Sequence, residues 1–282
     1  PITEYGMEVF QEFDLVVAMT PLTKWAGRVY ETRRIPEMID LAFRKALSGK
    51  PGPVYLDLPG DVLFGTVEES RVVWPSEQRP FVRAKPAGDP ALVERAVDLI
   101  ASAQRPVLLS GSGVLWSGAA EKLHKWVDQS GMPFFTTPQG RGVIPEDHPQ
   151  AFLGARSVAF KEADLIMVVG TRLNYVFGHG LPPRFSADVK MIRIDIDPME
   201  IDSSQRADVG IVGDAGAVLA QFAEAARKRV SVDMFAEWRK RLEKVEAQTK
   251  VTDIMEKVDR VFTEDDTLLA AAEYLLAAGN AR

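Results

Sequence analysis

The sequence predicts an α/β fold built on a doubly wound parallel sheet, and the evidence lies between Pro90 and about Lys228. Short segments such as PVLLSG, DLIMVVG and VKMIRIDID are almost wholly apolar. That pattern is typical of strands buried on both faces of a parallel sheet. They alternate with helical patterns such as ALVERAVDLIASA, SGAAEKLHKWVDQSG and GAVLAQFAEAARKR, as crossover connections require. We therefore expect a sheet of about six strands, flanked by helices, in a Rossmann-like domain over residues 90–230.

The flanking segments predict three further parts. Residues 1–68 indicate part of a second α/β unit, with DLVVAMT and GPVYLDL as strands and RRIPEMIDLAFRKALSGK as a helix. Pro36 fits the first turn of that helix, and Gly49 follows its end. Residues 69–89 are polar and rich in proline, which predicts a linker that crosses the surface. Residues 231–282 indicate a helical tail of unknown role, in which FAEWRKRLEKVEAQ leaves the domain.

Composition excludes several classes of function. The net charge of −6 argues against nucleic acid or an anionic membrane as the main partner. There is no cysteine, and the three histidines are far apart in the sequence without metal-ligand spacing, so we expect no metal site. No apolar run reaches the roughly 20 residues of a membrane helix, and a cytoplasmic setting is expected. The first residues resemble the middle of a domain, which suggests a fragment of a longer protein.

Residues at the ends of the predicted strands are candidates for ligand binding, because open α/β sheets bind ligands beyond the carboxyl ends of their strands. Glycines in LLSGSGVLWSG would let backbone approach a phosphate, although a tight turn explains them equally well. An arginine after VVGT could bind phosphate or stack on a base. Aspartates after IRIDID suit ribose hydroxyls, and the one in GIVGDAG is either a polar contact or a helix N-cap. These candidates are Gly111, Gly113, Arg172, Asp195, Asp197 and Asp214.

Catalytic patterns are missing from the sequence. It contains no Ser-His-Asp set and no P-loop, and the acidic run Glu264 to Asp266 reads as solvated charges at a helix start. Taken by its own residues, the middle domain is predicted to bind a nucleotide without carrying out chemistry.

Several longer stretches resemble thiamine-diphosphate enzymes of the acetolactate synthase type. VFQEFDLVVAMTPLTKWAGRV and LSGKPGPVYLDLPGDVL are similar to the end of their pyrimidine-binding domain. GMPFFTTPQGRGVIPEDHPQAFLGARS, EADLIMVVGTRLNYVFGHGLPPRF and VKMIRIDIDPMEI are similar to their central domain. The stretch R-L-N-aromatic followed by G-L-P-P-R resembles the branch of 2-hydroxyacyl-CoA lyase and oxalyl-CoA decarboxylase. The resemblance covers roughly residues 1–230.

This resemblance implies a ligand for the central domain, namely the ADP portion of CoA or free ADP. Arg172 would touch the adenine nucleotide, Asp195 and Asp197 would lie at its ribose, and Asp214 would lie near the base. Lys50 stands where the family usually has an arginine that contacts phosphate, and so lacks the bidentate fork.

Two features leave the ligand open. Ser112 replaces a family lysine in the turn between Gly111 and Gly113, which weakens the case for tight ADP binding. In the acetolactate synthases, moreover, the same edge binds FAD.

The resemblance also implies thiamine diphosphate and Mg²⁺ in a longer parent protein. Phe10 and Gln11 match the stretch that approaches the thiazolium and the substrate. The family's activating glutamate and its G-D-G…N motif are expected outside these 282 residues, so we expect this chain alone to be inactive. The family implies a small acyl-CoA substrate and a homodimer or homotetramer.

Three functions stay open at this point. The first is a lyase that cleaves or forms the bond between a formyl unit and the carbonyl carbon of a 2-hydroxyacyl-CoA. The second is an acetolactate-synthase-like carboligase or 2-oxoacid decarboxylase with FAD on the central domain. The third is a non-catalytic nucleotide-binding module that shares only the fold.

Overall fold

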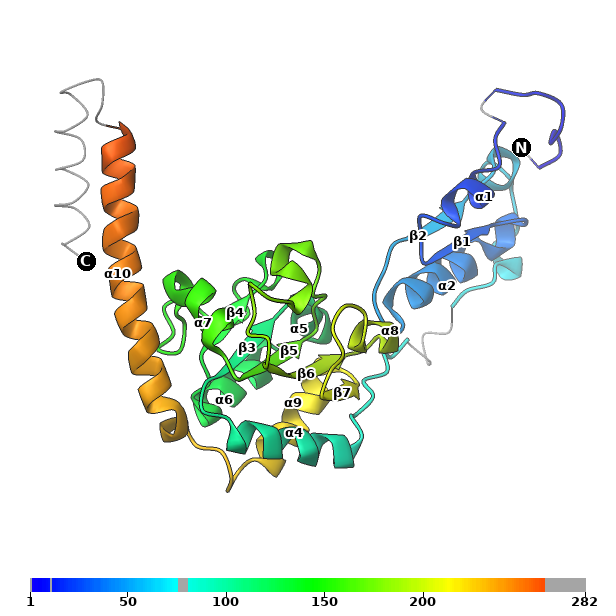
Figure 1. Ribbon diagram of the computed structural model, residues 1–282. Coiled ribbons are helices and arrows are strands. Elements are labelled where there is room, and N and C mark those ends of the chain that lie inside the picture. The colour runs from blue at the N-terminus through cyan, green and yellow to red at the C-terminus, as the bar shows by residue number, and fades with distance from the viewer. Residues whose placement is uncertain (1, 11, 76–80, 262–282) are drawn as a thin grey trace. The chain divides into compact units, whose positions relative to one another are not determined.

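The computed structural model describes residues 2–10, 12–75 and 81–261, with side chains described as far as residue 248. The chain divides into two compact units, Pro1–Lys85 and Pro86–Arg282 (Figure 1). Each unit is described by itself below, and the boundaries predicted for the smaller segments stay a prediction.

The second unit is built on a parallel sheet of five strands. They are β3 (Pro106–Ser110), β4 (Phe134–Thr136), β5 (Leu165–Val169), β6 (Lys190–Asp195) and β7 (Val209–Val212), in the order β4-β3-β5-β6-β7. Leu108 of β3 pairs with Phe134 on one side and with Met167 on the other. The α/β class and the parallel sheet are confirmed, with five strands in the described residues rather than about six. Between β5 and β6 the chain forms a 3-10 segment, η5 (Tyr175–Gly180), in place of a further helix or strand.

Helices pack in two groups around this sheet (Figure 1). On one face, α9 (Ala215–Ala225) contacts both α4 (Pro90–Ser102) and α6 (Ala120–Ser130), with Trp126 of α6 edge-on to Phe222 of α9 at 5.5 Å between ring centroids. On the other, α7 (Arg156–Glu162) places Phe160 against Phe135 of β4 and Phe185. β3 and β5 are buried along their whole length, and β4 and β6 along most of theirs, so the core follows the sheet.

The helix α10 (Ala236–Val261) begins on the domain surface. Trp238, Leu242 and Val245 are buried in the core of the second unit, and the Trp238 indole N–H donates to the Pro106 carbonyl at 3.1 Å. The prediction that this stretch leaves the domain is therefore wrong for residues 238–245. Their spacing of four and three residues forms one apolar stripe, which needs a surface to cover it.

The strand order locates the edge where a ligand is expected. The first strand of the unit, β3, has β4 on one side and β5 on the other. The chain therefore reverses its direction of winding between β3 and β5. In this arrangement the crevice beyond the carboxyl ends of those two strands is the usual ligand position.

The first unit is smaller and has little core. Its sheet is a parallel pair, β1 (Trp25–Arg28) and β2 (Val54–Asp57), accompanied by α1 (Leu15–Met19), α2 (Ile35–Leu47) and α3 (Gly60–Leu63), with 3-10 turns η1 (Thr32–Arg34) and η2 (Glu69–Arg71). Among its described residues, the buried apolar side chains are Val29, Ala42 and Val62. A two-stranded sheet with so little buried area is marginally stable alone.

One strand prediction in this unit is wrong. DLVVAMT forms α1, and Asp14 caps the helix by accepting a hydrogen bond from the Val17 amide at 3.4 Å. A short apolar run does not distinguish a strand from a helix by periodicity, and here the N-cap aspartate was the informative residue. The predicted helix at α2 and the strand at β2 are confirmed.

Candidate functional site

Two glycine turns meet backbone to backbone where the winding reverses. The Gly113 amide, in the first turn of α5 (Ser112–Ser117), donates to the Gly170 carbonyl at 2.9 Å. A Cβ on Gly113 would lie 2.6 Å from the Gly170 Cα, and one on Gly111 would strike Thr171. Gly170 itself has a φ of +59°, which favours glycine. The glycines are thus required by the contact between the β3 and β5 turns, as the tight-turn alternative expected.

Arg172 follows this turn at the carboxyl end of β5. Its side chain is 69% exposed, and its Nε lies 3.7 Å from Oε1 of Glu200, whose side chain is 10% exposed. That separation exceeds a hydrogen bond, so the contact is a loose ion pair that leaves most of the guanidinium in solvent. Arg172 therefore presents a positive charge at the edge where the strand order predicts a ligand.

The aspartates after β6 lie at the next strand end. Asp195 accepts a hydrogen bond from the Asp197 amide at 2.9 Å, and Asp197 caps α8 (Pro198–Ile201) by accepting from the Met199 amide at 3.0 Å. Both are partly exposed. Because β6 neighbours β5, the structure brings these two carboxylates to the same edge as Arg172. Their assignment to a ribose stays a prediction.

Asp214 follows β7 and is buried. Its Oδ1 accepts from the Ser117 hydroxyl at 2.8 Å and from the amides of Gly216 and Ala217, each at 3.1 Å. The structure thus shows the N-cap alternative, on α9. A carboxylate with 1% residue exposure is also poorly placed to meet a ligand without local rearrangement. A contact between Asp214 and a nucleotide base stays a prediction.

Two residues near this edge were missed by the sequence analysis. Glu200 on α8 is the acidic partner of Arg172. Arg193 lies inside β6, is buried, and places its Nη1 3.4 Å from the Ser203 hydroxyl. Burial lowers the pKa of Arg193, and the charges of Glu200, Asp195 and Asp202 partly offset this shift. An arginine in the middle of the apolar segment VKMIRIDID was the signal that could have found it.

The remaining candidates lie in the first unit. Phe10 is 91% exposed, and Gln11 lies outside the described residues. Lys50 is partly buried in the turn before β2, where its carbonyl accepts from the Lys24 ammonium at 2.9 Å. A contact between Lys50 and phosphate stays a prediction.

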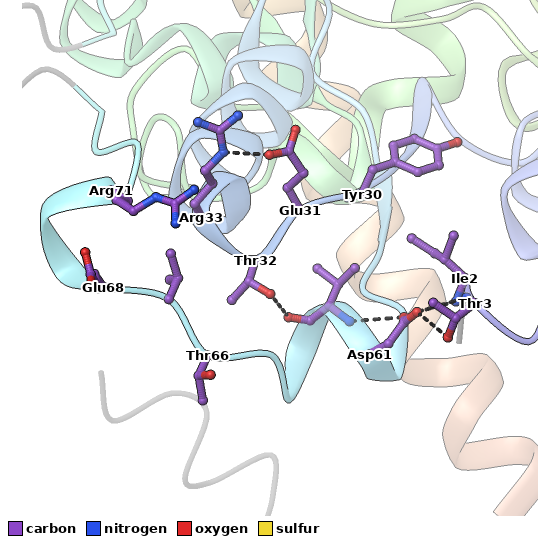
Figure 2. Close-up of a pocket in the computed structure, with 12 residues that line it drawn as sticks. Ile2, Thr3, Tyr30, Glu31, Thr32, Arg33, Asp61, Thr66, Glu68 and Arg71 are labelled. Atoms are coloured by element: carbon purple, nitrogen blue, oxygen red, sulfur yellow. Dashed lines mark hydrogen bonds and ion pairs between the residues drawn. The ribbon is translucent and has the colours of Figure 1, made fainter.

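The first unit also has an open hollow of about 840 Å³, shown in Figure 2. Charges of both signs line it, including Glu31, Arg33 and Asp61, and Arg33 donates to Glu31 at 2.6 Å. Asp61 accepts from the amides of Ile2 and Thr3, at 2.8 and 3.0 Å, and these hydrogen bonds lower its pKa to about 2. No residue predicted from the sequence as part of the site lines this hollow.

Two of the three histidines lie side by side in the fold. His124 and His148 are distant in the sequence, yet their rings meet with centroids 5.0 Å apart, and Asp128 lies beside both. The fold thus brings together two histidines that are far apart in the sequence, where we expected no metal site. Spacing along one chain does not show that a loop returns to a helix.

Comparison with known proteins identifies the fold family. Residues 93–222 match the family described as "Thiamine pyrophosphate enzyme, central domain". Residues 93–222 belong to this family of central domains. The parallel sheet, the point where its winding reverses, and Arg172 at the carboxyl end of β5 all lie within this central domain.

Relatives from several branches match most of the chain. A 2-hydroxyacyl-CoA lyase of Oryza sativa subsp. japonica is 38% identical over 221 residues, covering 76% of this chain and 38% of the relative. A probable acetolactate synthase large subunit of Methanocaldococcus jannaschii is 38% identical over 228 residues, covering 78% and 38%. An oxalyl-CoA decarboxylase of Escherichia coli K12 is 35% identical over 207 residues, covering 73% and 36%. The chain thus spans a little over a third of the length of these relatives.

Thiamine diphosphate is held through a Mg²⁺ ion, which needs oxygen ligands from the protein. Within the described residues, the one group of three or more histidine or acidic side chains close enough to share a metal ion is His124, Asp128 and His148, in the central domain. The described part of the first unit, where Phe10 lies exposed, therefore does not by itself fit this cofactor with its metal. None of the described helices is both long and apolar enough to cross a membrane.

Proposed function

We propose that this chain is part of a thiamine-diphosphate-dependent carbon–carbon lyase that acts on a 2-hydroxyacyl-CoA. The longer protein would release a formyl unit joined to CoA, or join the two parts in the reverse acyloin condensation. Thiamine diphosphate supplies carbanion stabilisation in such enzymes. The family and the similarity to 2-hydroxyacyl-CoA lyases support this proposal. We further propose that the protein works in the cytoplasm as a homodimer or homotetramer.

The central domain would hold the ADP portion of CoA, or free ADP, at the edge between β3 and β5. The observation that carries this proposal is the exposed Arg172 guanidinium beside the turn where the winding reverses. An exposed arginine forms strong, charge-assisted hydrogen bonds with phosphate oxygens. Asp195 and Asp197 follow the neighbouring strand and carry the acceptors that ribose hydroxyls need.

A second candidate is an acetolactate-synthase-like carboligase, or a related 2-oxoacid decarboxylase, that carries FAD at the same edge. The similarity to the Methanocaldococcus jannaschii protein, at the same 38% identity, favours it equally by sequence. The ligand discriminates the two, because FAD contributes a flavin that absorbs visible light and ADP does not. The third candidate, a nucleotide-binding module without catalysis, predicts nucleotide binding in a longer protein that has no lyase activity.

Calorimetry on the purified chain tests the ligand. We expect saturable binding of ADP and of CoA, with ADP competing for the CoA site, and weaker binding of FAD. Tighter binding of FAD than of ADP, or flavin absorbance in the purified protein, would replace the CoA lyase with the carboligase. If none of the three ligands binds, the proposed nucleotide site is wrong.

A further inference from the structure

A cluster of three side chains lies where α6 meets the loop that follows β4. His124 and Asp128 stand one helical turn apart on α6, and His148 comes from the loop. Asp128 Oδ1 lies 3.0 Å from His148 Nε2, and Asp128 Oδ2 lies 3.7 Å from His124 Nε2. One ligand atom from each of the three residues lies within 4.8 Å of the other two.

The cluster lies away from the proposed nucleotide edge. The residue after the His148–Pro149 step, Gln150, accepts a hydrogen bond from the Phe134 amide at 3.1 Å, and Phe134 begins β4. The cluster therefore sits by the amino end of that strand, whereas the nucleotide edge lies beyond the carboxyl ends of β3 and β5. An inference about the cluster does not depend on the proposed function.

The cluster is partly preorganised. The His148 side chain is 7% exposed and packs edge-on against the rings of His124 and Phe134. The side chains of His124 and Asp128 are 41% and 60% exposed, so an ion could reach the group from solvent.

We propose that His124, Asp128 and His148 form a binding site for Zn²⁺. Two imidazoles and a carboxylate, without thiolate, are a donor set that suits zinc among common biological cations. Tetrahedral zinc with ligands at about 2.0–2.1 Å places neighbouring ligand atoms about 3.3 Å apart. The contacts of 3.0 and 3.7 Å involve different oxygens of Asp128, and one ligand atom from each residue lies within 4.8 Å of the others. Side-chain rotations that draw the three atoms together would fill three corners, and water would take the fourth.

The hydrogen bond from the Gln150 amide to His148 opposes metal binding, because it sets the tautomer of the imidazole. The Gln150 amide donates to His148 Nδ1 at 3.2 Å, which leaves Nε2 as the protonated nitrogen that faces Asp128. Zinc needs the lone pair of Nε2. The ring must therefore lose its proton at Nε2 and take one up at Nδ1. The imidazole stays neutral in this exchange, but the hydrogen bond from the Gln150 amide is broken. This exchange weakens the site relative to one with a preset tautomer.

The bound ion would tie α6 to the loop after β4. His124 and Asp128 belong to the helix and His148 to the loop. An ion shared by all three would add to the ring contact of the two histidines and take the place of the hydrogen bond between His148 and Asp128. A ligand that binds only the folded protein raises its melting temperature.

Zinc titration of the chelator-treated 282-residue chain tests the proposal. We expect one saturable zinc ion per chain by calorimetry, together with a higher melting temperature. His124→Gln and Asp128→Asn change exposed ligands without disturbing the core, and each should lower zinc affinity at least about tenfold. His179→Gln is the matched control, because His179 is exposed and lies outside the cluster; it should leave zinc affinity unchanged.

Nitrogen-15 NMR of the histidine rings provides a second readout. Without zinc, His148 should show a protonated Nε2, and zinc should move the proton to Nδ1. The proposal is overturned if zinc does not bind with saturation, if His124→Gln and Asp128→Asn leave its affinity unchanged, or if the His148 tautomer stays the same when zinc is bound.

Discussion

At the scale of single residues, Asp214 shows that one sequence pattern fits both a ligand contact and a structural role. An aspartate after a strand end suits both a ligand contact and an N-cap, and the sequence pattern is identical for the two. The structure adds the Ser117 hydroxyl, 97 residues away, as a third donor to the same carboxylate oxygen. Through that hydrogen bond Asp214 links α5 to α9, in addition to capping α9.

The structural role of Asp214 predicts a large loss of stability on substitution. Asp214→Ala removes a buried acceptor of three hydrogen bonds, so we expect the free energy of unfolding to fall by about 2–4 kcal/mol. Asp89 is the matched control, because it caps α4 through a single hydrogen bond and is exposed. Asp89→Ala should lower the same free energy by about 1 kcal/mol or less. Urea denaturation measures both. An unchanged stability in Asp214→Ala with weaker ADP binding would support the nucleotide contact instead.

Asp61 gives a prediction about pH. Hydrogen bonds from the amides of Ile2 and Thr3 lower its pKa from 3.8 to about 2 in the folded chain. Because the pKa of Asp61 is lower in the folded chain than in the unfolded chain, its carboxylate stabilises the folded state at any pH above the unfolded pKa. This contribution is lost as the pH falls through the folded pKa. The attachment of residues 2–3 should therefore persist at pH 4 and weaken between about pH 3.8 and 2.

Carbon-13 NMR of the Asp61 carboxyl group measures this titration directly. We expect a midpoint near 2, with the Ile2 and Thr3 amide shifts following the same curve. A midpoint near 3.8 would show that these amides do not bind Asp61 in solution.

At the scale of elements, the sequence was most informative where a pattern is long and repeats. The buried strands β3, β5 and β6 and the helices α2, α4 and α9 follow from their periodicity. DLVVAMT failed because seven residues hold too little periodicity to exclude a helix. The partner of an amphipathic helix is likewise absent from its own sequence, so the packing of α10 could not be predicted.

The packing of α10 predicts that its buried stripe stabilises the central domain. Leu242 is fully buried, so Leu242→Ala should lower the free energy of unfolding by about 2–5 kcal/mol through a lost side chain and a cavity. Glu243→Ala, at the adjacent exposed position, is the control and should change stability by less than about 0.5 kcal/mol. Equal stability for both variants would mean that α10 does not pack on the domain in solution.

At the scale of the whole molecule, the parallel sheet was predictable but the order of its strands was not. Alternating strands and helices fix the parallel direction, whereas the neighbours of β3 depend on which side each crossover takes. Only the observed order places Gly111, Gly113 and Arg172 at one winding reversal. The candidate residues were therefore identified separately from sequence, and their assembly into one edge came from the fold.

Calorimetry with ADP tests whether this edge binds a nucleotide through Arg172. Arg172→Ala should weaken ADP binding by about 1–3 kcal/mol, the scale of a lost charged hydrogen-bond partner. Its melting temperature should hardly change, because an exposed ion pair contributes about 0–1 kcal/mol to stability. Arg227 is the matched control: it is also 69% exposed and paired with one glutamate, and it follows the opposite end of α9 from the Asp214 cap. Arg227→Ala should bind ADP like the wild type. Equal ADP affinity in Arg172→Ala and wild type would contradict the nucleotide site proposed for this edge.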